Sequence, residues 1–250
     1  MSARPYWENY LPSSRILPPR AWSRSDAPRL DLSGQWRFRY SPTAHGEDRF
    51  AAADFDDSAW PTLTVPSHWQ LAGFGTPAYT NVRYPFPVDP PRVPDENPTG
   101  DYRVSFDLPG GWAGGSVTLR FDGLDSCGRV WLNGRLIGDL SGSRLPAEFD
   151  ITPAARCPGP NVLAVRVHQW SSGSYLEDQD MWWLSGIFRP VSVLSRPAGA
   201  IEDHHVHDDY DHRTGAGTLR VEASCAAAVR LRVPELEVDC AAGETVRIPV

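Results

Sequence analysis

Residues 171–191 hold the side-chain types that could bind a sugar. Four consecutive acidic or amide residues stand shortly before two adjacent tryptophans: Glu177, Asp178, Gln179, Asp180, Trp182 and Trp183. Planar acceptor groups take hydrogen bonds from neighbouring sugar hydroxyls, and an aromatic face covers the C–H surface of the ring. Adjacent residues of an extended chain point in opposite directions, so one of the two tryptophans is expected in the core and at most one at a sugar site.

The elements that must position this segment are predicted to be strands. Apolar residues alternate with polar ones in short runs: Trp36, Phe38 and Tyr40; Tyr102, Val104, Phe106 and Leu108; Val117, Leu119 and Phe121; Leu163, Val165 and Val167. This pattern predicts an antiparallel sandwich in which each sheet has one buried and one wet face, with Arg103 and Arg166 on the wet side. Asn133 and Gly134 tolerate positive φ angles and predict a two-residue hairpin. The fold class is therefore all-β, with about eight or more strands.

The chain divides into three zones. Residues 1–28 form an extended lead rich in Pro and Arg, and residues 29–197 form the first sandwich. In residues 198–250 the strand pattern restarts around Leu219, Val229 and Val246, with too few strands to close a second sandwich. Open sheet edges normally need cover, so we expect a truncated polypeptide whose second sandwich is incomplete.

A proline-rich loop interrupts the first sandwich. Residues 76–100 carry seven prolines, which restrict the backbone and let the loop hold side chains in place without regular secondary structure. A loop of this length in a compact domain is more often functional than incidental.

Composition excludes several classes of function. The chain has 250 residues and a net charge of −7, and all 24 basic residues are scattered arginines, so neither nucleic acid nor a membrane is an expected partner. No apolar run suits a signal peptide or a membrane span. The cysteines show no CxxC spacing and are expected to be reduced thiols, which favours a cytoplasmic location. They are Cys127, Cys157, Cys225 and Cys240.

The tract HHVHDDYDH at residues 204–212 offers a second candidate for chemistry. His205 and His207 share one side of an extended strand, and together with Asp209 they could coordinate a metal. The tract is very polar and lies between the two predicted sandwiches. A solvated linker strand is therefore the favoured interpretation.

A series of motifs in matching order resembles the sugar-binding domain of glycoside hydrolase family 2, specifically its large β-galactosidases. The resemblance spans roughly residues 30–197. It rests on SGQWRFRY, VPSHWQ, TNVRYP, ENPTG, FDGLDSCGRVWLNGRLIG, SRLPAEFD and YLEDQDMWWLSGIFRPV. The SRLPAEFD and YLEDQDMW motifs favour this branch over the β-glucuronidases of the family. Two positions depart from the family pattern: Trp183, where Arg is expected, and His68, where Asn is more usual.

The resemblance implies a jelly-roll sandwich, then an immunoglobulin-like sandwich, and loops that reach over a later (β/α)₈ barrel. It implies that Asp180 helps bind sodium and the galactose hydroxyls, and that Asn81 lines the same subsite with Val82 as its neighbour. It also implies sodium and magnesium as cofactors of the complete enzyme and a homo-oligomer. A carboxylate can bridge a hard cation and a hydroxyl pair, while an amide offers a donor and an acceptor on one plane.

The reactive carboxylates are not expected in this chain. Retaining glycosidases use two, and the resemblance places both on the barrel as glutamates, the acid/base one following an asparagine. The sequence has no Asn-Glu dipeptide and no alternating strand–helix pattern. The chain alone should therefore hydrolyse nothing.

Three interpretations of the whole chain stay open. They are the amino-terminal portion of a β-galactosidase, a stand-alone carbohydrate-binding module, and a non-catalytic subunit that complements a separate barrel. Solvated or turn roles for Glu177, Asp180 and Asn81 are the simpler alternatives at the level of single residues. Arg144, Glu148 and Asp150 are expected to form a buried structural ion pair.

Overall fold

The computed structural model describes residues 4–10, 13–20, 25–44, 46–177, 179–197, 199–225, 227–233, 236–240 and 245–249. The described residues form strands and short 3₁₀ turns, which confirms the all-β prediction. The strands of the first sandwich are β1 (Arg29–Asp31), β2 (Gly34–Ser41), β3 (Thr62–Val65), β4 (Ala78–Thr80), β5 (Thr99–Leu108), β6 (Ser116–Phe121), β7 (Cys127–Leu132), β8 (Arg135–Ser141), β9 (Ala147–Asp150), β10 (Gly159–His168), β11 (Met181–Trp183) and β12 (Val191–Arg196). The 3₁₀ turns are η1 (Tyr6–Glu8), η2 (Asp48–Ala51), η3 (Trp69–Ala72), η4 (Gly110–Trp112) and η5 (Ser172–Tyr175).

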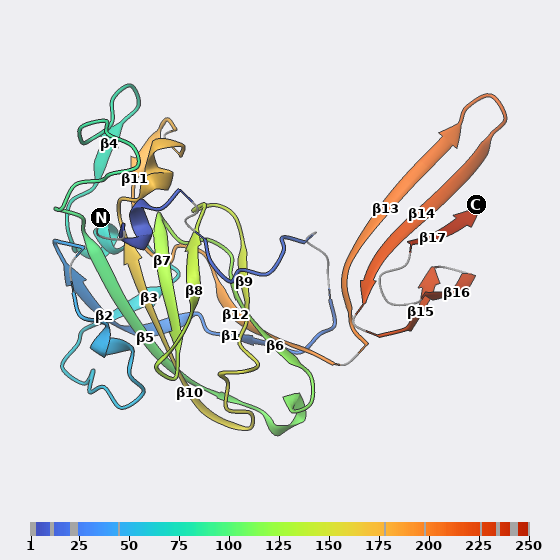
Figure 1. The fold of residues 1–250 in the computed structure, drawn as a ribbon, viewed down its shortest axis with the longest axis horizontal. Helices are drawn as coiled ribbons and strands as arrows, with labels where there is room; N and C mark the ends of the chain where they lie inside the picture. Colours follow the sequence, from blue (N-terminus) through green and yellow to red (C-terminus); the bar gives the residue numbers. More distant parts are fainter. Residues whose placement is uncertain are drawn as a thin grey trace.

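Two antiparallel sheets face one another (Figure 1). One sheet has the strand order β1-β12-β6-β9, and the other has the order β3-β2-β5-β10-β7-β8. The apolar side chains of the predicted alternation fill the space between the sheets. The largest fully buried side chains of this core, which also draws on residues outside the alternation, are Trp36, Trp69, Tyr102, Phe38, Phe121 and Phe149. Burial of such large aromatic side chains is the main stabilising contribution to a sandwich core.

The hairpin predicted at Asn133 and Gly134 is confirmed. Asn133 has a φ of 53° and Gly134 a φ of 84°, as a type I′ turn requires. The turn joins β7 to β8, with Leu132 paired to Arg135. Its Asn133 side chain also donates a hydrogen bond to the carbonyl oxygen of Ala154 at 2.9 Å, which fixes the turn to the neighbouring loop.

The outer face of the six-stranded sheet is covered where Arg103 and Arg166 stand, so the prediction that these two side chains lie on a wet face was wrong. Arg103 is 3% exposed and Arg166 is 5% exposed. The segment that contains η2 lies over them: Arg166 Nη1 donates to the carbonyl oxygen of Gly46 at 3.0 Å, and Arg103 Nη1 donates to that of Ala52 at 3.0 Å. Burial is tolerated because Arg166 also pairs with the Asp101 carboxylate at 2.7 Å.

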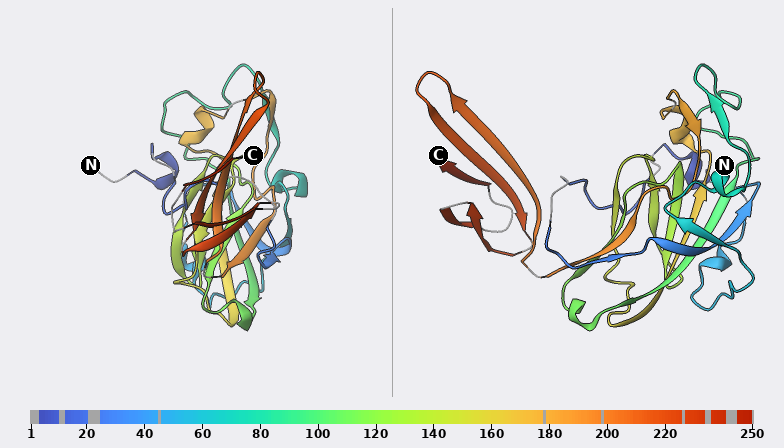
Figure 2. Two further views of the ribbon diagram at one scale, coloured as in Figure 1. Left: turned by 90° about the vertical axis from the view of Figure 1, so that its right-hand side faces the viewer. Right: turned by 180° about the vertical axis from the view of Figure 1, so that it is seen from behind.

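The remaining strands lie beyond the sandwich. They are β13 (Ile201–Asp211), β14 (Ala216–Cys225), β15 (Val229–Val233), β16 (Leu236–Cys240) and β17 (Thr245–Pro249). Strands β13, β14 and β17 form one antiparallel sheet, and β15 and β16 form a separate pair. The long hairpin of β13 and β14 extends away from the sandwich (Figure 2). Strands are thus present in each region where the sequence pattern predicted a restart.

Among the described residues, no helix is long and apolar enough to cross a membrane. Cys127 and Cys157 are free thiols, and Cys127 and Cys225 are buried. The side chain of Cys240 lies outside the described set.

Candidate functional site

The proline-rich loop and the acidic segment meet in a short strand pair at one end of the sandwich (Figure 1). Residues 78–80 of the loop form β4, which pairs antiparallel with β11. The loop therefore does contain regular secondary structure, contrary to prediction. Thr80 is paired with Met181. Asn81 directly follows Thr80 and Asp180 directly precedes Met181, so the two predicted site residues stand side by side at the same end of the pair.

Both predicted residues are exposed, and each lies in a bend next to its strand. The Asp180 Oδ1 atom accepts a hydrogen bond from the Tyr79 hydroxyl. This hydrogen bond raises the pKa of Tyr79 above its usual value, because it stabilises the protonated phenol beside a carboxylate. Sequence reasoning missed Tyr79. Its position two residues before Asn81, in a run that becomes a strand, is the signal that could have indicated it.

The two tryptophans point to opposite sides of β11, as predicted. Trp182 is 56% exposed and its ring lies 5.7 Å from that of Tyr79. Trp183 is half-buried, its ring centroid lies 5.4 Å from that of Trp170, and its Nε1 donates to Thr80 Oγ1 at 2.8 Å. Trp183 therefore anchors the strand pair to an aromatic cluster, while Trp182 and Tyr79 present an exposed aromatic surface beside Asp180. That surface could cover the apolar face of a sugar.

Several hydrogen bonds hold the loop and the acidic segment in place. The fully buried Asn97 side chain donates to the Trp170 carbonyl oxygen and accepts from the Trp170 amide, both at 2.8 Å. The Tyr175 hydroxyl donates to the carbonyl oxygen of Arg92 in the loop. At the start of η5, Ser171 and Ser174 form a reciprocal capping box. The residues near Asp180 thus stand on backbone that is fixed from both sides.

Glu177 has a structural position. Its carboxylate accepts hydrogen bonds from the Ser143 amide, at 3.2 Å, and from the Ser143 hydroxyl. Arg144 Nη1 lies 3.6 Å from this carboxylate and 2.8 Å from that of Asp125. These contacts favour a structural role for Glu177 over a role as a sugar ligand. Asp178 lies outside the described residues.

The prediction that Arg144 pairs with Glu148 and Asp150 was wrong. Glu148 instead pairs with Arg120 at 3.1 Å and with Arg20, because β9 lies beside β6 and not beside the loop that carries Arg144. Arg144 extends to Asp125 and also contacts the Met181 sulfur at 3.4 Å, next to Asp180. Burial raises the pKa of Asp125 to about 7, against the opposing effect of Arg144.

His68, one of the two positions that depart from the family pattern, packs beneath the same region. Its ring is stacked on that of Phe188, with centroids 5.1 Å apart and an interplanar angle of 10°. Burial lowers the pKa of His68 below its usual value, so the neutral ring is favoured. The residue thus has a packing role in the structure.

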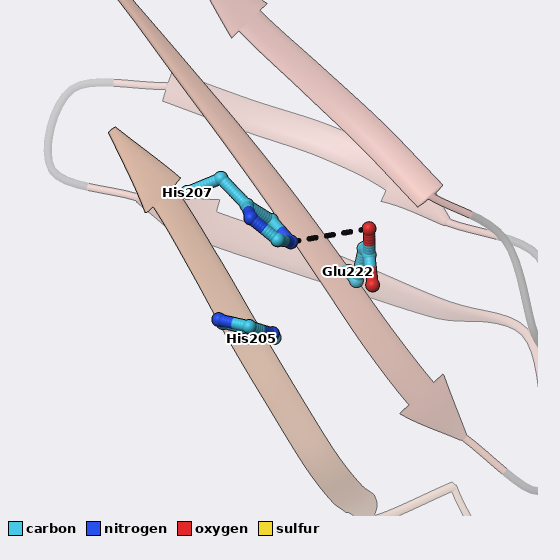
Figure 3. A group of neighbouring side chains, drawn as sticks. All are labelled: His205, His207 and Glu222. Carbon is cyan, nitrogen blue, oxygen red and sulfur yellow. Dashed lines mark ion pairs between the residues drawn. The ribbon is translucent and has the colours of Figure 1, made fainter. Parts of the chain in front are cut away.

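The histidine tract forms part of β13, and its cluster differs from the predicted one. His205, His207 and Glu222 bring their potential ligand atoms together (Figure 3). The sequence offered Asp209 as the possible third ligand, whereas in the structure Glu222 stands directly opposite His205 and Asp209 pairs with Thr218. Register across the hairpin decides which acid comes near, and that register is not visible in the tract itself.

Comparison with known proteins identifies relatives of the chain. The model of the family described as "Glycosyl hydrolases family 2, sugar binding domain" matches residues 30–197. A β-galactosidase of Arthrobacter sp. (strain B7) is 52% identical over 242 residues, covering 88% of this chain and 23% of that protein. A β-galactosidase of Psychromonas ingrahamii is 49% identical over 191 residues, covering 76% of this chain and 18% of that protein.

Solved structures show the same fold. A β-glucuronidase from Ruminococcus gnavus superimposes with a TM-score of 0.64 at 18% identity, covering 91% of this chain and 40% of that one. Identity at this level supports the architecture alone. The chain spans less than a quarter of the length of the two β-galactosidases.

Proposed function

Because the chain belongs to glycosyl hydrolase family 2, with the sugar-binding domain of the family at residues 30–197, we propose that it forms the amino-terminal part of a β-galactosidase and supplies part of its galactose subsite. The complete enzyme would hydrolyse terminal β-galactosides with retention of configuration. The similarity to two β-galactosidases at 52% and 49% identity supports this choice of sugar.

One observation carries the proposal. Asn81 and Asp180, which come from segments about a hundred residues apart, stand next to each other at the end of the β4–β11 pair. Both side chains are exposed, so they can be reached by a ligand. A carboxylate accepts hydrogen bonds from two neighbouring hydroxyls, and an amide both donates and accepts. These are the interactions that fix the orientation of a sugar ring.

The same residues fit part of a sodium site. Hard cations take several oxygen ligands, and the exposed side chains of Asp180 and Asn81, at the same end of the strand pair, would each offer one. Tyr79 donates a hydrogen bond to Asp180 Oδ1, and the carboxylate keeps further lone pairs for a cation or a hydroxyl. When bound, the ion would hold a sugar hydroxyl by charge. Its remaining oxygen ligands, and a magnesium site, would come from other parts of the complete enzyme.

The reaction itself requires groups from elsewhere. A retaining glycosidase needs two carboxylates about 5–5.5 Å apart, one acting as acid/base and one as nucleophile. We assign these to the remaining domains of the same enzyme. The proline-rich loop and the acidic segment also expose large apolar side chains, which those domains would cover. They are Tyr79, Val82, Val88, Leu176 and Trp182.

An assay of two polypeptides tests the proposal. The 250-residue chain alone and a longer polypeptide that continues into a barrel are each incubated with a chromogenic β-galactoside. We expect hydrolysis by the longer polypeptide and none by the chain alone. Hydrolysis by the chain alone would overturn the proposal. Tight galactose binding by the chain alone, with no activity in the longer polypeptide, would instead support a stand-alone carbohydrate-binding module.

A further inference from the structure

We propose that His205, His207 and Glu222 form a zinc-binding site on the hairpin of β13 and β14. The site lies outside the sugar-binding domain, and the proposal does not depend on the proposed β-galactosidase function. It rests on the placement of three side chains that each offer one ligand atom (Figure 3).

The backbone places the three side chains on one face of the sheet. His205 and His207 are two residues apart on β13, so they point the same way. Glu222 on β14 is paired directly with His205, and residues paired across antiparallel strands share a face. The buried residues of β14, which are Val221, Ala223 and Cys225, point to the opposite face. The three candidate ligands therefore lie on the more open side of the sheet.

The distances suit a small cation. All three potential ligand atoms lie within 4.8 Å of one another. His207 Nε2 lies 3.2 Å from Glu222 Oε1. Two ligands of a tetrahedral zinc ion, each about 2.0–2.1 Å from the metal, are themselves about 3.3 Å apart. The His207–Glu222 edge of the site already has this length, and a small rotation of the exposed His205 ring would bring in the third ligand.

The His207 nitrogen gives an independent indication. Its Nε2 atom is shielded from solvent and makes no hydrogen bond within the described residues, although the Glu222 carboxylate is near. The His205 and His207 rings are stacked, with centroids 4.0 Å apart and an interplanar angle of 30°. The stack holds the two rings together on one face of β13, as a pair of ligands to one metal ion requires.

Arg220 is the group that opposes metal binding. It is paired with His207 across the strands, and its Nη1 atom contacts Glu222 Oε1. Its positive charge would disfavour a cation at this carboxylate. The arginine side chain is on the open face and is about one-third exposed, so it can move away when a metal binds. The metal ion would thus replace Arg220 as the partner of the Glu222 carboxylate.

Donor chemistry selects the metal. Two imidazoles and one carboxylate suit borderline transition-metal ions better than the hard ions Ca²⁺ and Mg²⁺, which prefer ligand sets made only of oxygen. Three protein ligands leave the fourth tetrahedral position of Zn²⁺ to water. A bound ion would join β13 to β14 and protect the amides of this edge strand from local opening.

The test is a zinc titration followed by calorimetry, on tag-free chain first treated with a chelator. We expect one Zn²⁺ per chain. His205→Ala, His207→Ala and Glu222→Gln should each weaken binding about tenfold or more, because each removes one of three ligands. His204→Ala and His212→Ala are matched controls from the same tract, and both should bind zinc within about twofold of the original chain. Arg220→Gln should bind zinc as well or more tightly, because the guanidinium is not a ligand.

Hydrogen exchange gives a second measurement that does not depend on affinity alone. Zinc should slow amide exchange around residues 205–207 and 220–222, and this slowing should vanish in the His205→Ala/His207→Ala double variant. The proposal is overturned by three results: no stoichiometric binding, binding that survives in the double variant, or an equal loss of binding in His204→Ala. A loss of binding in Arg220→Gln would also contradict it.

Discussion

The Tyr79 hydroxyl donates a hydrogen bond to Oδ1 of Asp180 across the β4–β11 pair. This contact joins the proline-rich loop to the acidic segment at the point where both predicted sugar ligands stand. It restricts the orientation of the exposed Asp180 carboxylate by holding its Oδ1 atom. Tyr79 is therefore a positioning residue in the proposed subsite.

Removing the Tyr79 hydroxyl should weaken the site without disrupting the fold. In Tyr79→Phe the carboxylate loses one donor but keeps its place, and exposed hydrogen bonds of this kind contribute about 1 kcal/mol. We expect kcat/KM of the complete enzyme for a β-galactoside to fall about fivefold, with an unchanged thermal midpoint. Steady-state kinetics and thermal unfolding check this result. A fall of the thermal midpoint that accounts for the lost activity would assign Tyr79 a structural role only.

Trp182 and Trp183 should contribute unequally to the free energy of unfolding. Trp183 packs against Trp170 and donates to Thr80, so Trp183→Ala should destabilise the chain by about 2 kcal/mol, below the cost of removing a fully buried tryptophan. Trp182 is exposed, and Trp182→Ala should change the free energy of unfolding by less than about 0.5 kcal/mol. Urea denaturation of both variants gives the comparison. Equal losses of stability would show that the two side chains are not on opposite sides of the strand.

The sequence-based predictions were correct where a structural feature depends on residues that are near one another in the sequence. The Asn133-Gly134 turn and the alternation around Trp36 and Phe38 follow from neighbouring residues, and both are confirmed. The burial of Arg166 could not be predicted, because the covering residues come from a segment more than a hundred positions away. When its distant partners are unknown, an arginine in a strand pattern is assigned to the solvent-exposed face.

The same limit applies to the candidate sites. Asn81 and Asp180 could be named from their motifs, whereas their adjacency follows from the pairing of β4 with β11. In the histidine tract, Asp209 is near in sequence, but the register of the hairpin brings Glu222 to the histidines. Residue types are visible in a sequence, and the partners supplied by another strand are not.

Asp125 should make stability depend on pH. Burial raises its pKa from 3.8 to about 7, so the folded chain holds a proton that the unfolded chain has already lost between these values. Its contribution to the free energy of unfolding is complete below pH 4 and is lost as pH rises to about 7, at up to about 1.4 kcal/mol per pH unit. Asp125→Asn keeps the shape of the side chain and should remove this part of the slope.

Urea denaturation of the chain and of Asp125→Asn at pH 5, 6, 7 and 8 measures the difference. Asp107→Asn, on an exposed position of β5, is the matched control and should follow the unmodified chain. Parallel stability profiles for the chain and for Asp125→Asn would show that Asp125 ionises at its ordinary pH in the folded state.

The role of Asp180 provides the most direct measurement. The Asp180→Asn change is made in the complete enzyme, with Asp107→Asn as the matched control, and kcat/KM is measured with a chromogenic β-galactoside. The variant keeps a planar side chain but loses the charge that holds a cation and strengthens hydrogen bonds to sugar hydroxyls. We expect kcat/KM to fall about a hundredfold or more, equivalent to about 2.7 kcal/mol, with the thermal midpoint and the control unchanged. Activity of Asp180→Asn equal to that of the control would contradict the assignment of this chain to the galactose subsite.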